Sequence, residues 1–276
     1  LSEKLLVSVP TRNPFTRFGC TIITLGSNIY MIGEFSSRVF FMDCRSHTWH
    51  ESPRMRTFPN LTKVSVIDGK IYVVEGERCI YSDSSNLVEF FDPETQIWEC
   101  VPNPSAEIRG RYVLRSLAID GKLYLFGDKD LVYKPKENIW DVVGFEMQFH
   151  RIPRFCFCVI DKVIYYYNEI SRMLEWYDPQ GSSWGSLKGL EELPELPLLS
   201  VTCVTLVDSD GKIAFFWEKK VCRPIGYNNK RIWCAEIALE RRNAQEIYGK
   251  IEWCDVVLTL PKSCSIYEFN AVSITV

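Results

Sequence analysis

The chain has 276 residues, of which 46% are hydrophobic and 24% charged, and its formal net charge is −3. This composition is ordinary for a globular protein, and the slightly acidic balance gives no reason to expect nucleic acid or an acidic membrane as partner. No apolar run approaches the roughly 18 residues that would be needed to span a bilayer.

The residue usage favours an all-β protein in a reducing compartment. Aromatic residues reach 13%, and their flat rings pack well on the pleated surface of strands. The 11 cysteines include no C-x-x-C pair, so we expect free thiols and a cytoplasmic or nuclear location. The chain begins without a Met and without an apolar signal segment, so we expect it to be part of a longer protein.

Predicted strands follow one another along the whole chain. A short β-rich segment at residues 4–9, "KLLVSV", is followed by five similar phrases: "LGSNIYMIG", "IDGKIYVVEG", "IDGKLYLFGD", "IDKVIYYYN" and "DSDGKIAFFW". These phrases recur every roughly 40 to 50 residues, which indicates a propeller or a solenoid. The predicted repeats cover about residues 17–62, 63–112, 113–153, 154–199 and 200–262, and "AVSITV" ends the chain.

Each repeat reads as four short antiparallel strands. In the second repeat, "KVSVI" and "KIYVVE" flank Asp68-Gly69, and Asp-Gly between two apolar runs predicts a tight hairpin whose central residues both have positive φ. A third run, "LVEFF", ends at Asp92-Pro93, where the chain turns back into a fourth run near Trp98. Four strands per repeat without helical periodicity predict propeller blades.

A tryptophan recurs at one spacing after the third strand of four repeats. The pairs are Asp43 with Trp49, Asp92 with Trp98, Lys134 with Trp140, and Asp178 with Trp184. We expect these rings to fill the widening space between neighbouring blades; the alternative is that they form a ligand cage.

The pairing of G-x-x-I-Y-x-x-G with the Asp-Pro-to-Trp spacing resembles the kelch repeat. The similarity to plant F-box/kelch-repeat proteins extends over nearly the whole chain. The segments that carry it include "DSSNLVEFFDPETQIWECVP", "IDGKLYLFGDK" and "KRIWCAEIALERRNAQEIYGKIEWCDVVLT", and the chain resembles that family in them. The resemblance implies a kelch-type β-propeller, a single domain over residues 1–276, with six blades as the most favoured number. The sixth would close with both chain ends, "KLLVSV" as its outer strand and "AVSITV" as its innermost.

The resemblance also implies a non-catalytic protein-recognition module. In such proteins an upstream F-box docks on the adaptor of an SCF ubiquitin ligase, and the propeller captures the protein substrate for ubiquitination. No F-box is visible in this chain, so the link to the ligase is an expectation by analogy. The alternatives are a stand-alone kelch scaffold and a sugar-active or copper-oxidase propeller.

Arginines recur in the loops that leave the predicted outer strands. These loops read "SPRMRTFPN", "NPSAEIRGR" and "FHRIPR", and arginine suits carboxylate or phosphate groups. We therefore predict that an acidic or phosphorylated segment of a partner binds at one mouth of the propeller, at Arg54, Arg56, Phe58, Arg109, Arg111, Tyr112, Phe149, Arg151 and Arg154. The alternative is that each arginine pairs with a neighbouring acid and braces the blades.

The sequence predicts neither an enzyme nor a cofactor. The three histidines are His47, His50 and His150, and the first two face opposite sides of a strand, which does not suit a shared copper ion. The motifs of phosphate loops, serine hydrolases and zinc proteases do not occur in the sequence. The polar stretch "ALERRNAQEIYGKIEW" is expected to be a surface hairpin, with a short helix as the alternative.

Overall fold

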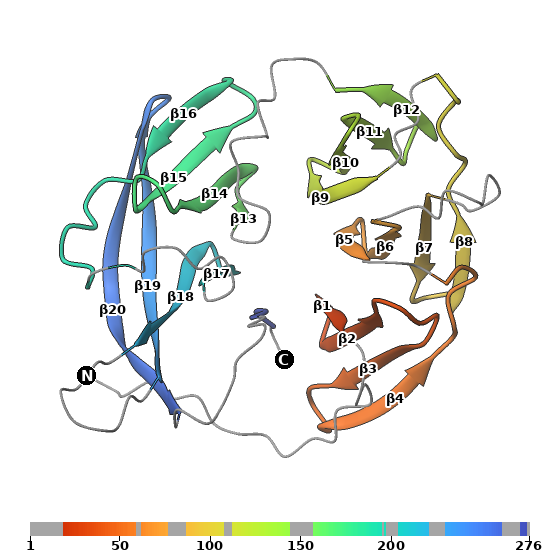
Figure 1. Cartoon of the computed structure of the whole chain (residues 1–276), viewed down its shortest axis with the longest axis horizontal. Helices are drawn as coiled ribbons and strands as arrows, with labels where there is room; N and C mark the ends of the chain where they lie inside the picture. Colours follow the sequence, from red (N-terminus) through yellow and green to blue (C-terminus); the bar gives the residue numbers. More distant parts are fainter. Residues whose placement is uncertain are drawn as a thin grey trace. The chain divides into compact units, whose positions relative to one another are not determined.

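A computed structural model describes residues 19–58, 62–76, 87–107, 112–143, 157–194, 196, 204–220, 230–260 and 271–274. Within these residues the chain forms twenty strands and no helix, arranged as five antiparallel sheets of four strands each (Figure 1). In every sheet the strands lie side by side in chain order. The predicted all-β architecture of four-stranded repeats is therefore confirmed.

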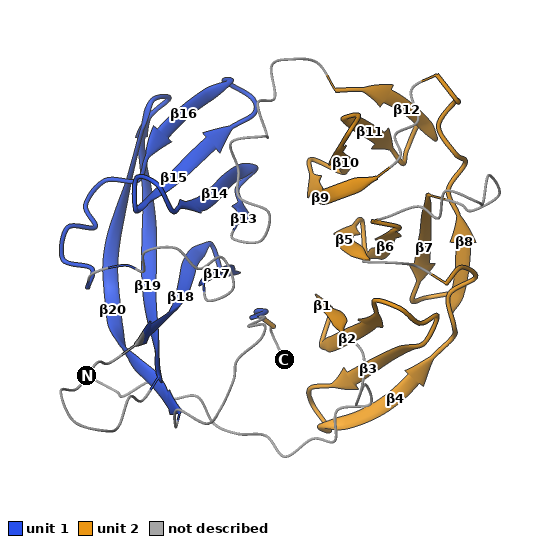
Figure 2. Ribbon diagram, viewed as in Figure 1, with its two compact units in different colours: residues 1–9, 148–273 blue, residues 10–147, 274–276 orange. Residues whose placement is uncertain are grey.

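The chain divides into two compact units, coloured in Figure 2. Unit 2 comprises residues 10–147 and 274–276 and holds the first three sheets. The strands of its first sheet are β1 (Cys20–Leu25), β2 (Asn28–Gly33), β3 (Val39–Asp43) and β4 (Thr48–Ser52). The second and third sheets consist of β5 (Lys63–Ile67), β6 (Lys70–Val74), β7 (Val88–Asp92), β8 (Ile97–Cys100), β9 (Val113–Ile119), β10 (Lys122–Gly127), β11 (Leu131–Lys134) and β12 (Ile139–Val142).

Unit 1 comprises residues 1–9 and 148–273 and holds the other two sheets. The fourth sheet consists of β13 (Phe157–Ile160), β14 (Val163–Asn168), β15 (Met173–Asp178) and β16 (Ser183–Ser186). The fifth consists of β17 (Val204–Ser209), β18 (Lys212–Lys220), β19 (Lys230–Asn243) and β20 (Glu246–Leu260). The last two strands form a long hairpin that turns at Ala244-Gln245, so the hairpin predicted for this polar stretch is confirmed.

The tight turns between the first and second strands have the predicted conformation. Asp68 and Gly69 have φ of 47° and 75°, and Asp120 and Gly121 have 52° and 68°. Asp161-Lys162 forms the same turn without a glycine, with φ of 49° and 66°. Two successive residues with positive φ match the right-handed twist of the flanking strands, so these turns fix the register of each hairpin.

A four-residue turn explains the constant spacing between Asp and Trp. Asp92 ends β7 and pairs with Ile97 across the turn, so the next residue, Trp98, pairs with Phe91. The carboxylate of Asp92 accepts a hydrogen bond from the backbone N–H of Glu94 at 2.9 Å, which caps the turn. The last turn residue has positive φ in all four cases: His47, Gln96, Asn138 and Ser182.

Neighbouring sheets within each unit approach through their first strands. In unit 2, β5 contacts both β1 and β9, and the hydroxyls of Ser65 and Ser116 lie 3.1 Å apart. In unit 1, β13 contacts β17. Buried apolar clusters join each of these neighbouring pairs of sheets.

Each predicted repeat contains one of the five sheets, whereas the predicted closing blade lies mostly outside the described residues. Residues 1–18 and 275–276 are not described, so closure by the two chain ends stays a prediction. Among the residues that are described, no helix is long and apolar enough to cross a membrane.

Candidate functional site

The loop between β4 and β5 is held tightly against its own unit. Met55 is buried, and its backbone N–H donates to the carbonyl of Ser37 in the β2–β3 loop at 2.9 Å. The carbonyl of Pro53 accepts a hydrogen bond from the indole Nε1 of Trp98 on β8, also at 2.9 Å. Two other parts of unit 2, the β2–β3 loop and β8, therefore fix the start of this loop.

A buried carboxylate fixes the following residues. Glu89 on β7 is only 2% exposed, yet it accepts the backbone N–H of Arg56 at 2.9 Å and that of Thr57 at 3.2 Å. The hydroxyl of Thr57 donates to the same carboxylate. A buried charge is tolerated where several donors converge on it, so Glu89 acts as the internal anchor of the loop.

Because Met55 and Thr57 point inward, the residues that alternate with them point to solvent. Arg54 and Arg56 are exposed, and Phe58 is 70% exposed. Glu51 lies 3.8 Å from Arg54 and also pairs with Arg38 at 3.3 Å, whereas Arg56 has no ion pair among the described residues. The alternative that each arginine pairs with a neighbouring acid therefore holds in part for Arg54. Within the described residues it does not hold for Arg56.

The β2–β3 loop adds two further side chains at the same edge of the first sheet. Phe35 is 41% exposed, and the guanidinium of Arg38 lies 4.6 Å above the ring of Phe40. The hydrogen bond between Met55 and Ser37 shows that the two loops lie together. We name this surface the loop edge and define it by Phe35, Arg38, Arg54, Arg56 and Phe58.

The structure locates part of the predicted partner site. Tyr112 precedes β9, is 40% exposed, and its backbone N–H donates to Asp128 at 3.3 Å. The other predicted residues lie outside the described residues: Arg109, Arg111, Phe149, Arg151 and Arg154. Their contribution stays a prediction.

Two of the four repeated tryptophans lie where neighbouring sheets meet. Trp98 is 3% exposed in a cluster built from the first two sheets, and it packs on Phe91 with ring centroids 5.1 Å apart. Trp140 packs on Tyr133 at 5.0 Å, and its Nε1 donates to the carbonyl of Pro102 at 2.6 Å. Trp184 packs on Tyr177 at 4.1 Å and lines a hollow.

Trp49 differs from the other three tryptophans. It pairs with Met42 across the strand, and within the described residues its buried Nε1 has no hydrogen-bond partner.

Sequence reasoning missed Glu89, Phe35 and Arg38. One signal was available for Glu89, since it is a charged residue within the apolar run "LVEFF" on a strand buried on both sides. The position of the β2–β3 loop beside the β4–β5 loop depends on tertiary contacts, so no local pattern indicates Phe35 and Arg38.

The loop edge combines positive charge with apolar surface. Its arginines offer hydrogen-bond donors with positive charge, and its two phenylalanines offer apolar surface. Among the residues that the structure describes, no group of three or more His, Cys, Asp or Glu side chains is arranged to hold a metal ion.

Comparison with known proteins shows which family the chain belongs to. The family model described as "FKB95, Kelch-repeats domain" matches residues 1–258. The chain belongs to this kelch-repeat family. The kelch-type β-propeller predicted from the sequence is thereby confirmed as its fold class, and the five four-stranded sheets are five of its blades.

Relatives of this kelch chain include plant proteins with an F-box in their names. F-box/kelch-repeat protein At4g11770 of Arabidopsis thaliana is 57% identical over 99% of this chain and 69% of that protein. F-box/kelch-repeat protein At4g39550 of Arabidopsis thaliana is 40% identical over 96% of this chain and 67% of that protein. Together with the propeller fold, these names support a protein-interaction module.

A solved structure agrees on the fold alone. The structure of YjhT superimposes with a TM-score of 0.50, covering 76% of this chain and 75% of that chain at 13% identity. So low an identity carries no information on activity.

Proposed function

We propose that this kelch chain is the substrate-binding part of an F-box receptor of an SCF ubiquitin ligase, and that its loop edge binds an acidic or phosphorylated segment of the substrate. The observation that carries the proposal is the β4–β5 loop, whose inward residues are fixed while Arg54, Arg56 and Phe58 face solvent. The names of the relatives support the link to an F-box.

Rigidity favours binding at this loop. A surface that is fixed before the partner arrives loses little conformational entropy on association. Glu89, Ser37 and the indole of Trp98 supply that rigidity without using the exposed side chains.

The charge at the loop edge favours an acidic partner. Arg56 has no ion pair within the described residues, and the exposed pairs of Glu51 with Arg38 and Arg54 contribute little stability in water. A carboxylate or phosphate can displace these weak contacts and gain charge-assisted hydrogen bonds. Phe35 and Phe58, which are exposed at the same loop edge, then offer apolar anchors.

Peptide binding tests the recognition step. We expect an array of acidic and phosphorylated peptides to bind the chain more strongly than neutral peptides of the same length. Replacing Arg54 and Arg56 by Glu is expected to weaken that binding at least tenfold, because both attraction and donor groups are lost. The control is Lys136→Glu, which alters an 81%-exposed cation. Lys136 lies in the β11–β12 turn of the third sheet and is not part of the loop edge. Equal losses in both variants would contradict the proposal.

The ligase link has its own test. We expect the ligase adaptor to be captured by a longer chain that includes the upstream part of the reading frame, and not by residues 1–276 alone. Failure of the longer chain to bind the adaptor would leave a stand-alone kelch scaffold as the better account.

A further inference from the structure

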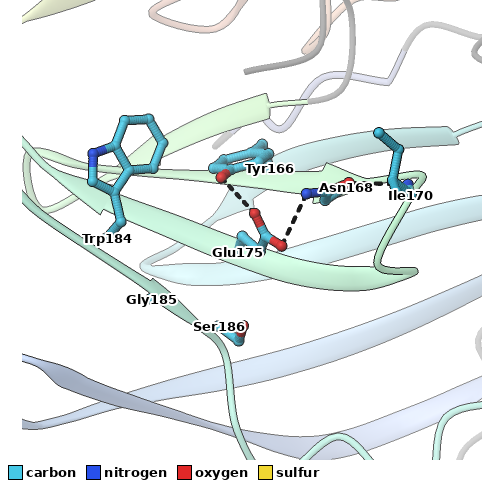
Figure 3. A pocket seen from close by; sticks show the side chains of 7 residues that line it. All are labelled: Tyr166, Asn168, Ile170, Glu175, Trp184, Gly185 and Ser186. Carbon is cyan, nitrogen blue, oxygen red and sulfur yellow. Dashed lines mark hydrogen bonds between the residues drawn. The ribbon is translucent and has the colours of Figure 1, made fainter. Parts of the chain in front are cut away.

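A second surface with its own chemistry lies on the fourth sheet, in unit 1. A hollow of about 590 Å³ is lined by Tyr166, Asn168, Ile170, Glu175, Trp184, Gly185 and Ser186 (Figure 3). This volume lies within the roughly 300–1,000 Å³ typical of small-ligand sites.

The register of the sheet brings the polar lining residues together. Tyr166 on β14 pairs with Glu175 on β15, and Glu175 pairs with Ser186 on β16, so the three lie in one row across the sheet. Asn168 and Trp184 lie two residues from members of that row and therefore share its face. The opposite face carries Tyr165, Tyr167 and Trp176, which belong to the core shared with the fifth sheet.

Within the part of the chain that the structure describes, Glu175 is held in place by neutral groups. Its Oε2 accepts the hydroxyl of Tyr166 at 2.6 Å, and its Oε1 accepts the amide of Asn168 at 2.9 Å and the hydroxyl of Ser171 at 2.8 Å. Among the described residues no cation pairs with this carboxylate. Its negative charge is therefore oriented but not neutralised.

The hydrogen bonds also determine what the carboxylate can still accept. A carboxylate has about four acceptor positions, and two of the three that are used are on Oε1. Counting the hydrogen bonds from described residues, one position remains, on Oε2. A single free position suits a compact ammonium group better than the paired donors of a guanidinium, which need both oxygens.

Aromatic and apolar side chains complete the surroundings of Glu175. Trp184 stacks on Tyr177 at 4.1 Å and meets Tyr166 edge-on at 6.1 Å, so its ring is firmly placed. The face of an indole attracts a cation. At the other end of the hollow Ile170 is 96% exposed and can cover the aliphatic stem of a long side chain.

We propose that this hollow binds the ammonium group of a lysine side chain from a partner protein. The ammonium would donate to Oε2 of Glu175 and to the hydroxyl of Ser186, beside the indole of Trp184, with its stem along Ile170. The site is independent of the loop edge, because it lies on a different sheet and recognises the opposite charge.

Titration of the full chain with small amides tests the assignment. The probes are N-acetyl-lysinamide, N-acetyl-argininamide and the neutral N-acetyl-norleucinamide, and the readout is the indole N–H resonance of Trp184, assigned with Trp184→Phe. We expect a saturable shift at millimolar lysinamide, a weaker response to argininamide, and none to norleucinamide. A norleucinamide response equal to that of lysinamide, or a preference for argininamide, would overturn the proposal, and in this test Trp184→Phe serves for assignment alone.

A charge-removing variant adds a second test. Glu175→Gln keeps the shape of the side chain, and we expect it to weaken lysinamide binding at least tenfold. The control is Glu240→Gln, an exposed acid of the same unit that lies outside the hollow; it is expected to leave the titration unchanged. Unaltered binding in Glu175→Gln, in a protein whose backbone amide spectrum shows it to be folded, would refute the assignment.

Discussion

At the scale of single residues, the buried carboxylate of Glu89 is the most consequential side chain near the loop edge. It satisfies two backbone N–H groups and one hydroxyl in a site with 2% exposure. Its role is to fix a loop in which Arg54, Arg56 and Phe58 face solvent.

Replacing Glu89 by Ala is expected to lower the free energy of unfolding by about 2–4 kcal/mol, because several donors lose a charged acceptor. Urea denaturation measures the change. The control is Glu51→Ala, which removes an exposed acid whose side chain is 45% accessible and is expected to cost under about 1 kcal/mol. Similar costs for the two variants would contradict the anchoring role.

The carboxylate of Asp178 predicts a specific dependence of stability on pH. Burial acts to raise its pKa, but hydrogen bonds from Arg241 and from the backbone N–H groups of Gln180 and Gly181 together hold the pKa below its usual value of 3.8. A carboxyl group with a lowered pKa in the folded state stabilises the fold above its unfolded pKa. That stabilisation is lost as the pH falls from 3.8 through the folded value.

We therefore expect Asp178→Asn to be less stable than the unaltered chain at pH 7, with the difference shrinking below pH 3.8. Chemical denaturation at a series of pH values measures this. A difference that stays constant down to acid pH would show that Asp178 contributes no pH-dependent stability.

At the scale of elements, the four-residue turn links sequence pattern to packing. The turn places each tryptophan opposite the residue before the Asp or Lys, and in three sheets that residue is aromatic: Phe91, Tyr133 and Tyr177. The indole of Trp98 then reaches back to Pro53 at the end of the preceding sheet. The same local motif thus fixes the register of the hairpin and joins its sheet to the preceding sheet.

We expect Trp98→Ala to destabilise the chain by about 3–5 kcal/mol, because a fully buried ring between two sheets is lost. Trp98→Phe, which keeps a ring but loses the hydrogen bond to Pro53, is expected to cost less. The same Ala change at the more exposed Trp140 serves as the comparison. Thermal or urea unfolding measures the loss of stability in each variant. A larger loss for the Ala variant at Trp140 than for Trp98→Ala would contradict the packing described for Trp98.

The elements were largely predictable because their signals are local. Asp-Gly turns, Asp-Pro turns and the recurrent tryptophans lie next to the strands that they delimit, so the predicted repeats each contain one sheet. Asp161-Lys162 shows the limit, since this turn takes the same conformation without the glycine that marks the others.

The candidate sites were less predictable, because they depend on contacts between distant segments. Arg54, Arg56 and Phe58 were selected from loop composition, but their outward orientation follows from Glu89, more than thirty residues further along the chain. The hollow around Glu175 arises from the register of three strands, and alternation along one strand does not reveal it.

At the scale of the whole molecule, two surfaces of opposite chemistry stand on separate units. The loop edge in unit 2 presents cations and phenylalanines, and the hollow in unit 1 presents an oriented carboxylate beside an indole. The two sites are separable by mutation. Both surfaces fit the protein-interaction role that the kelch fold and the names of the relatives support.

The most direct test of the central claim places a photo-crosslinking amino acid at position 58 of the full-length protein in plant cells. We predict crosslinks to an acidic or phosphorylated segment of a partner, lost when Arg54 and Arg56 are replaced by Glu. The same crosslinker at Ile97, an exposed position on β8, is expected not to give them. The same partner captured from both positions, or capture that persists without the two arginines, would contradict recognition at the loop edge.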